Sequence, residues 1–207
     1  MADYLLPITY YLLPITYYLL PFPSKTMLTS TDFRGLFNER FWQNFLPIPA
    51  ENTSEIGWKT PDFELPDMTN GRLVRLSNYR ADRAVLLDFT RIFTEKQYCP
   101  FCYPHIKALN ANYEKFTEKG IEVLLITSTD ESQSQIVVRD LGLKMPLLSD
   151  SLCRVFRTYK VGQALGAPLP AQFILDVEGK IIYKHLFSFL SPNASMETLL
   201  EVVNQLG

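Results

Sequence analysis

Two apolar runs in the middle of the chain constrain its fold more than any other feature. Residues 84–89 (AVLLDF) and 121–127 (IEVLLIT) have the length of strands and the composition of strands that are covered on both faces of a sheet. Between them, residues 99–118 carry apolar side chains at three- and four-residue spacings, which predicts an amphipathic helix closed by Gly120. Two such strands joined by a helix form a parallel β-α-β unit.

The flanking segments extend this unit with the same alternation. A turn at Asn70-Gly71 precedes a short predicted strand over residues 73–76. The elements expected after the unit are helices over 131–141 and 151–159, a short strand at 147–148, an antiparallel hairpin of 172–176 with 180–186, and a last helix from 196 to 206. The predicted architecture is an α/β fold with a central mixed sheet that is flanked by helices on both faces.

Composition restricts the class of protein. The chain has 207 residues, of which 47% are hydrophobic, so it can bury a sizeable core. A net charge of −2 supplies no positive field, and we expect no nucleic-acid partner. Three cysteines are too few for a disulfide-stapled secreted scaffold. We divide the chain into an extension over residues 1–26, a helix and linker over 27–55, and a main domain over 56–207.

The extension is built from a repeat. YLLPITY occupies residues 4–10 and again 11–17, and residues 18–21 continue with YLLP. Residues 4–22 carry no charge and are nearly long enough to span a bilayer, but their prolines remove backbone donors and clash with the preceding turn. The start of the chain also lacks the positive segment of a secretory signal. We therefore expect a low-complexity extension, with Met27 as an alternative start, and a cytoplasmic protein, with membrane contact or export as alternatives.

Residues 28–47 predict an amphipathic helix that is capped by Thr31 or Asp32. Its large apolar side chains, which recur at three- and four-residue spacings, are Phe33, Leu36, Phe37, Phe41, Trp42 and Phe45. We expect this face to pack on the main domain, and a surface for a partner is the alternative. Residues 47–55 then form a polar linker.

The chemistry of the chain is concentrated in Cys99-Pro100-Phe101-Cys102, between the first apolar run and the helix. Cys99 is expected near the helix N-terminus, where unpaired amides and the helix dipole favour a thiolate. Pro100 suits the first helical position because no donor is needed there. Cys102, one turn further, is then the thiol that resolves a mixed disulfide on Cys99. A Cys-x-x-Cys at such a junction indicates a thioredoxin-like fold.

A cysteine pair can also be half of a zinc site, but a complete site needs a second pair or matching histidines. Besides the pair, the chain offers only Cys153, His105 and His185. We therefore expect no metal and no other cofactor. His105 is expected on the surface of the helix, with copper binding or redox tuning as its alternative. Cys153 is expected to be a small core residue, with a third redox thiol as its alternative.

Residues 57–90 resemble the opening of the redoxin branch of the thioredoxin superfamily, which includes AhpC/TSA-like and peroxiredoxin-like proteins. The motifs that carry the resemblance are Pro61-Asp62-Phe63, Asn70-Gly71, Leu76-Ser77-Asn78-Tyr79, Leu148-Ser149-Asp150 and Phe173-Ile174-Leu175-Asp176 with Gly179. The resemblance covers residues 56–205. It implies a thioredoxin-like fold and an oxidoreductase that works through thiols.

The resemblance also implies roles for two residues outside the cysteine pair. Asp88 matches the buried acid that thioredoxins carry on the strand before the active helix, and that role is to accept the proton of Cys102. The loop over residues 90–98 is longer than in thioredoxin, and an acid at the end of the strand or on an edge strand is the alternative. Pro170 stands where the family has a cis-proline that faces the dithiol, and an ordinary trans proline is the alternative.

The chain departs from peroxiredoxins at the residues that bind peroxide. Their loop reads Pro-x-x-x-Thr/Ser-x-x-Cys, but counting back from Cys99 gives Lys96 at the hydroxyl position and Ile92 at the proline position. The arginine of that family falls on Pro170, and Arg91 could replace it only with a different geometry. We therefore expect an enzyme that reduces disulfides with Cys99 and Cys102 and is re-reduced by a thiol donor of the thioredoxin or glutathione kind. The alternatives are a thiol peroxidase that acts on hydroperoxides and a non-catalytic adaptor.

Overall fold

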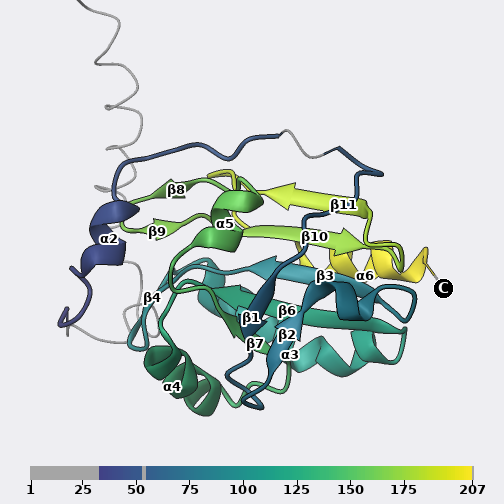
Figure 1. Cartoon of the computed structure of the whole chain (residues 1–207), viewed down its shortest axis with the longest axis horizontal. Coiled ribbons are helices and arrows are strands. Elements are labelled where there is room, and N and C mark those ends of the chain that lie inside the picture. Colours follow the sequence, from purple (N-terminus) through teal and green to yellow (C-terminus); the bar gives the residue numbers. More distant parts are fainter. Residues whose placement is uncertain (1–32, 53–54, 207) are drawn as a thin grey trace, which may run out of the picture.

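The computed structural model describes residues 33–52 and 55–206, and its centre is a five-stranded sheet (Figure 1). In the strand order β11-β10-β3-β6-β7, the strands are β3 (Ala84–Phe89), β6 (Ile121–Thr127), β7 (Leu147–Ser149), β10 (Ala171–Leu175) and β11 (Ile181–Leu186). β3, β6 and β7 are parallel, whereas β10 is antiparallel to both β3 and β11. The predicted mixed sheet, its parallel unit and its hairpin are confirmed.

Helices cover both faces of the sheet, as the alternation of elements predicts. They are the 3-10 helix η1 (Leu76–Tyr79) and the α-helices α3 (Cys102–Thr117), α4 (Glu131–Leu141), α5 (Arg154–Thr158) and α6 (Met196–Asn204). The side chains of Asp130 and Ser195 cap α4 and α6 by accepting backbone N–H groups of the first turn. Gly142 ends α4 in the left-handed conformation, with φ of 56°.

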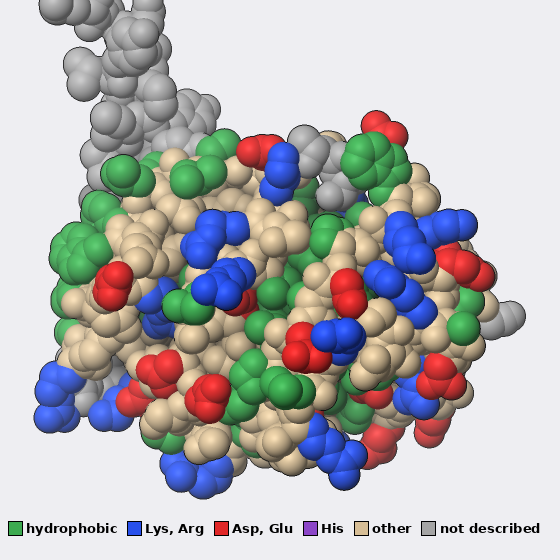
Figure 2. Space-filling view, viewed as in Figure 1, with side chains coloured by type: hydrophobic (Ala, Val, Ile, Leu, Met, Phe, Trp, Pro, Cys, Tyr) green, Lys and Arg blue, Asp and Glu red, His purple; other side chains and the backbone are tan. Residues whose placement is uncertain are grey.

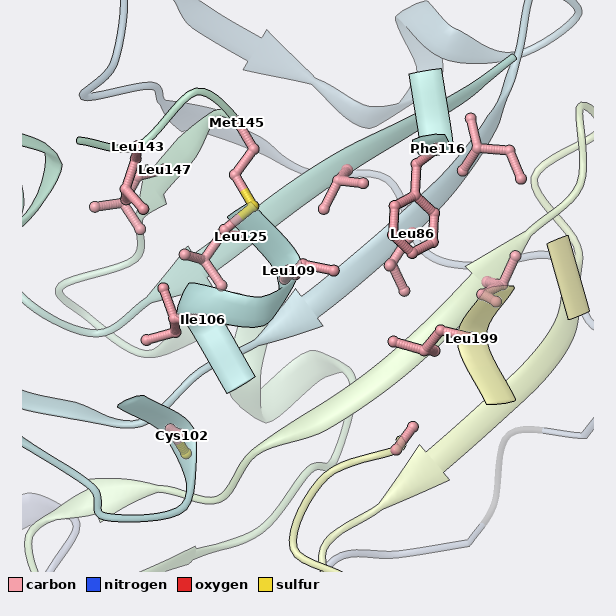
Figure 3. Close-up of a cluster of buried hydrophobic side chains, with 14 of the residues drawn as sticks. Leu86, Cys102, Ile106, Leu109, Phe116, Leu125, Leu143, Met145, Leu147 and Leu199 are labelled. Carbon is pink, nitrogen blue, oxygen red and sulfur yellow. The ribbon is translucent and has the colours of Figure 1, made fainter. Parts of the chain in front are cut away.

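Each face of the sheet carries its own core. The first core joins Leu86 of β3 and Leu125 of β6 to residues of α3, α4 and α6 (Figure 3). The second joins Leu87 and Phe89 of β3 to Phe156 of α5. Because successive side chains of a strand point to opposite faces, Asp88 shares the face of Leu86, which is the face that α3 covers.

Three two-stranded ribbons surround the sheet and are not all evident from the sequence. They are β1 (Glu64–Pro66) with β2 (Leu73–Arg75), β4 (Ile92–Thr94) with β5 (Gln97–Tyr98), and β8 (Gln163–Ala164) with β9 (Ala167–Pro168). Of these strands only β2 is predicted, because the Asn70-Gly71 turn marks its start; the others have no such signal, and their two or three residues are too few for alternation to be recognised. The β4–β5 ribbon fills the long connection between β3 and Cys99.

Two helices of the main domain begin three residues later than predicted. The helix expected from residue 99 begins at Cys102, and the one expected over 151–159 begins at Arg154. The second start is fixed by the Asp150 carboxylate, which accepts the backbone N–H groups of Arg154 and Val155 at 2.9 and 2.8 Å. Cys153, just before α5, adopts a left-handed conformation with φ of 53° and cannot belong to the helix.

The segment before the main domain contains a much shorter helix than predicted. α2 (Glu39–Gln43) begins after Asn38, whose side chain accepts the N–H of Phe41. Gly35, with φ of 79°, interrupts the helical conformation upstream. The predicted caps Thr31 and Asp32 lie outside the described residues, as do the repeat and Met27. Among the described residues, every helix is too short or too polar to cross a bilayer.

α2 packs on the main domain, but through few of its aromatic side chains. The Phe41 ring is buried against Gly166, where a Cβ atom would lie 2.0 Å from it. Ile48 and Gln163 exchange two backbone hydrogen bonds of 2.8 Å. The large apolar side chains that stay exposed on this segment are Phe33, Phe37, Trp42, Phe45 and Leu46. Hydrophobic side chains accordingly gather over α2 on the surface of the molecule (Figure 2).

Candidate active site

The two cysteines of the Cys-x-x-Cys motif lie together at the start of α3. The carbonyl of Cys99 accepts the backbone N–H groups of Cys102 and Tyr103, both at 3.0 Å, so Cys99 holds the first turn of the helix. This confirms its expected position near the helix N-terminus. Both cysteines are buried and carry free thiols, with residue exposures of 4% for Cys99 and 0% for Cys102.

The two thiols differ in acidity because they share one hydrogen bond. The hydrogen bond from Cys102 lowers the pKa of Cys99 to about 6; burial opposes this shift, while the Arg91 charge and the backbone N–H groups of Cys102 and Phe101 add to it. The same hydrogen bond, together with burial, raises the pKa of Cys102. The pair therefore holds one acidic sulfur and one that keeps its proton.

Arg91 is a part of the site that the cysteine motif does not reveal. Its carbonyl accepts the N–H of Cys99 at 3.2 Å, which ties the residue to the dithiol. Its guanidinium donates to the carbonyls of Ala164 and Leu165, and its carbon lies 4.7 Å from the centre of the Phe93 ring. The side chain is thus held in a buried position with its positive charge acting on Cys99.

Asp88 lies in the middle of the sheet and is fully buried. Its Oδ1 accepts a hydrogen bond of 2.7 Å from Gln172 Nε2, because Gln172 is its register partner on β10. Its Oδ2 lies 3.3 Å from His105 Nε2, an ion-pair distance whose geometry is not that of a hydrogen bond. The carboxylate is therefore held from the neighbouring strand and from α3.

His105 is the clearest departure from the sequence prediction. The expectation of a surface histidine is wrong, because residue 105 falls on the buried face of α3, one turn after Cys102. Burial is the largest single effect and lowers the pKa of His105, but the charge of Asp88 and its close side-chain contact together outweigh burial, and the net shift is upward. His105 follows Cys102 by three residues and precedes Leu109 by four, so the helical spacing does contain this signal.

A chain of amide groups connects Asp88 to the cysteine motif. Gln172 also donates to Asn193 Oδ1 at 3.1 Å, and Asn193 Nδ2 donates to the carbonyl of Phe101 at 3.1 Å. The Gln172 Oε1 accepts the backbone N–H of Ala194 at 2.9 Å. Sequence reasoning missed both amides; a glutamine inside the apolar run 171–175 was a usable signal, whereas Asn193 gave none.

Pro170 does not adopt the predicted conformation. No peptide bond between described residues is cis, so the expected cis-proline is wrong and the bond before Pro170 is trans. The backbone before β10 is held by a hydrogen bond of 3.0 Å from the N–H of Leu169 to the carbonyl of Gly162. The bond before Pro170 has the trans form that most X-Pro bonds adopt. Pro170 is buried immediately before β10, and its predicted catalytic role has no geometric support from a cis bond.

Cys153 is a buried residue away from the dithiol, as expected of a small core side chain. Burial, and then the Asp150 charge, raises its pKa to about 11, although Arg40 and Arg157 act in the opposite direction. Asn44 Nδ2 approaches its sulfur at 3.7 Å. In residues 33–52 and 55–206, no group of three or more His, Cys, Asp or Glu side chains is arranged to hold a metal ion.

Comparison with known proteins agrees with this fold. Thiol-disulfide oxidoreductase ResA of Bacillus cereus is 29% identical over 132 residues, which cover 63% of this chain and 69% of that protein. The chloroplastic peroxiredoxin Q of Triticum aestivum is 28% identical over 146 residues, or 70% of this chain and 64% of that protein.

Solved structures share the fold at lower identity. Peroxidoxin BcpB from Mycobacterium tuberculosis superposes with a TM-score of 0.64 at 23% identity, over 74% of this chain and 99% of that one. AhpC of Enterococcus faecalis gives a TM-score of 0.64 at 18% identity, over 74% and 92% of the two chains. The family comparison matches residues 56–184 to the AhpC/TSA family. The chain is therefore a member of the AhpC/TSA family with the thioredoxin-like fold of the peroxiredoxins.

Proposed function

We propose that this redoxin-type thiol oxidoreductase reduces disulfides, with Cys99 as the nucleophile and Cys102 as the resolving thiol. The observation that carries the proposal is the opposite acidity of the two hydrogen-bonded sulfurs. A pKa of about 6 makes Cys99 about nine-tenths thiolate at pH 7, and the thiolate is the attacking species. The ResA relatives, named thiol-disulfide oxidoreductases, support the same reaction.

The reaction follows from the positions of the sulfurs. The Cys99 thiolate attacks one sulfur of a substrate disulfide, the substrate S–S bond breaks, and one substrate thiolate leaves. Cys102 then loses its proton and attacks the sulfur of Cys99, which releases the second substrate thiolate and leaves a Cys99–Cys102 disulfide. Two electrons pass from the dithiol to the substrate. A thiol donor of the thioredoxin or glutathione kind returns the protein to the dithiol state by the reverse exchange.

Asp88 is the proposed acceptor of the Cys102 proton. It is buried on the face of the sheet that α3 covers, which is also the face where Cys102 packs.

We also propose a cytoplasmic location for the protein, because the dithiol has to be returned to its reduced state between turnovers.

A peroxidase reaction is the second candidate, and Arg91 is the observation that favours it. A buried guanidinium whose charge acts on the acidic cysteine is suited to polarise a bound peroxide. In that reaction the Cys99 thiolate attacks the terminal oxygen of a hydroperoxide, the O–O bond breaks, and an alkoxide, or hydroxide in the case of hydrogen peroxide, leaves. Cys99 becomes a sulfenic acid, and Cys102 then displaces water to form the disulfide. The relatives named peroxiredoxin Q support this reading.

The two candidates separate in one pair of assays on the full chain. Reduction of insulin disulfides with a dithiol donor measures the first activity, and consumption of hydrogen peroxide with the same donor measures the second. We expect insulin reduction to exceed peroxide consumption. Cys102→Ser should accumulate a mixed disulfide on Cys99, detectable as a mass adduct, and Cys99→Ser should accumulate none. Peroxide turnover that exceeds insulin reduction reverses the assignment, and absence of both activities leaves a non-catalytic adaptor.

A further inference from the structure

A buried polar cluster of Asp88, His105 and Gln172 lies between β3, α3 and β10. Asp88 Oδ2 and His105 Nε2 are 3.3 Å apart, and in the described part of the chain neither atom makes a hydrogen bond. The side-chain exposures of His105 and Asp88 are 8% and 0%. A buried carboxylate oxygen that lacks a hydrogen bond is costly unless a positive charge compensates it. The contact therefore fits an imidazolium beside a carboxylate.

The same imidazole stands close to the resolving cysteine. Cys102 and His105 are three residues apart on α3, and both are buried on its sheet-facing side. Side chains at this spacing have Cβ atoms about 5–6 Å apart. Figure 3 shows Cys102 at the start of this buried face, followed by Ile106 and Leu109. His105 thus contacts Asp88 and lies within electrostatic reach of the Cys102 sulfur.

The charge of the cluster during proton transfer explains why a cation is needed. Before the transfer, Cys102 is neutral and Asp88 is an anion; afterwards Cys102 is a thiolate and Asp88 is neutral. These two groups carry one buried negative charge at every stage, and a buried uncompensated charge is unfavourable. A protonated His105 makes the three groups neutral overall both before and after the transfer.

We propose that protonated His105 is the counter-charge of this transfer: it balances the charge of the Asp88 carboxylate before the transfer and that of the Cys102 thiolate after it. The proton moves from the Cys102 sulfur to Asp88, the thiolate attacks the sulfur of Cys99, and the bond between Cys99 and the substrate sulfur breaks. The substrate leaves as a thiolate. His105 touches neither substrate nor the reacting sulfur of Cys99, so it is a positioning residue, and its role rests on the proposed function.

The titratable groups on the elements around His105 come from β3, β6, α3, β11 and α6. They are Asp88 of β3, Glu122 of β6, Cys102, Tyr103 and Lys107 of α3, His185 of β11 and the exposed Glu197 and Glu201 of α6. Asp88 is the group whose charge raises the pKa of His105. His185 is in register with Gln172, but its Nε2 lies 2.9 Å from the carbonyl oxygen of Ser191. The upward shift in the pKa of His105, in which Asp88 outweighs burial, agrees with an imidazolium at neutral pH.

A two-step thiol reagent separates resolution from attack. When dithionitrobenzoate reacts with Cys99, the first release of thionitrobenzoate measures attack, and the second release, caused by Cys102, measures resolution. We expect His105→Gln to slow the second release roughly tenfold at pH 7, because one pKa unit changes the ionised fraction tenfold. The rate of the first release should stay unchanged. The pH midpoint of the second release should move upward, so that the variant approaches the native rate in alkaline solution.

The matched control is His185→Gln, which removes the histidine of the adjacent strand and should change neither release. An unchanged second release in His105→Gln overturns the proposal, and so does an equal slowing of both releases at every pH, since that is the result of a structural defect. If the native chain shows no second release, the proposed function fails instead.

An NMR titration of His105 in the native chain tests the proposal without any variant. We expect the imidazolium to be the main form of His105 at pH 7 in the dithiol, whereas a titration midpoint below 7 contradicts the proposal.

Discussion

The starts of α3 and α5 each carry a buried cysteine, yet the two thiols are shifted in opposite directions. The pKa of Cys99 falls to about 6, chiefly through its hydrogen bond with Cys102, and that of Cys153 rises to about 11, chiefly through burial. Both cysteines lie before the first turn of a helix, and the charge of at least one arginine lowers the pKa of each thiol. Position at a helix N-terminus therefore does not by itself make a cysteine acidic.

The backbone amides add a smaller part of the difference. At α3, the N–H groups of Cys102 and Phe101 act on the sulfur of Cys99 and lower its pKa. At α5, the Asp150 carboxylate accepts the N–H groups of Arg154, Val155 and Phe156, at 2.8 to 3.2 Å. That carboxylate both occupies the amides and places a negative charge near Cys153. The same helix geometry thus supports a nucleophile at one site and an inert thiol at the other.

Replacing each cysteine in turn should give the largest difference in activity between the two helix starts. We expect Cys99→Ser to abolish disulfide reduction, because an alcohol does not ionise at neutral pH and forms no disulfide. Cys153→Ala should retain native turnover, since its thiol remains protonated. The measurement is the initial rate of insulin reduction with each variant at equal concentration of folded protein. Loss of turnover in Cys153→Ala would give that thiol a redox role.

Alkylation kinetics sharpen the same contrast. Iodoacetamide reacts with thiolates, so the rate at Cys99 should reach half its maximum at about pH 6 and level off above about pH 7. Cys153, with a pKa of about 11, should be thiolate in only about one molecule in ten thousand at pH 7. We therefore expect modification at pH 7 to be confined to Cys99, as located by peptide mass spectrometry. A rate at Cys99 that keeps rising to pH 9 would show an ordinary thiol.

The strands and helices that hold this site could be predicted from the sequence, because their segments are long and have a clear period. The bounds of β3, β6 and α4 match the predicted ranges, since six or more residues give a clear alternation or helical period. The Cys-x-x-Cys spacing likewise located the dithiol at the start of a helix.

The residues that shift the pKa values of the dithiol were harder to predict from the sequence, because they reach it only through tertiary contacts. Arg91 comes near Cys99 only after the β4–β5 ribbon folds back, and that ribbon is too short to recognise. His105 had a signal in the helical stripe, but histidine is common on helix surfaces, and its partner Asp88 lies on another element. The trans bond before Pro170 shows that a family resemblance does not fix a backbone conformation at a single residue.

Replacement of Arg91 tests how much of the difference between the two thiols comes from a single charge. We expect Arg91→Met to move the midpoint of Cys99 alkylation above 6, by about one pH unit, because an opposite charge nearby shifts a pKa by about one to three units. Arg91→Lys keeps the charge and is the matched control, with a midpoint near that of the native chain. Equal midpoints in all three proteins would assign the acidity of Cys99 to the Cys102 hydrogen bond and the backbone amides alone.

The smallest expected effect tests the other helix. In a chain that also carries Cys99→Ser and Cys102→Ser, a pH titration of the rate of iodoacetamide alkylation reports the ionisation of Cys153 alone. Asp150→Asn should lower the midpoint of that titration below 11, because the negative charge that raises the pKa is lost while burial remains.

Asp150→Asn should also reduce the free energy of unfolding by about 1 kcal/mol, because an amide accepts fewer of the α5 N–H groups than the carboxylate does. In the chain with native cysteines, the same substitution should leave insulin reduction unchanged. An unshifted midpoint would mean that burial alone keeps Cys153 protonated, and the amides of α5 would then have no part in the contrast between the two helices.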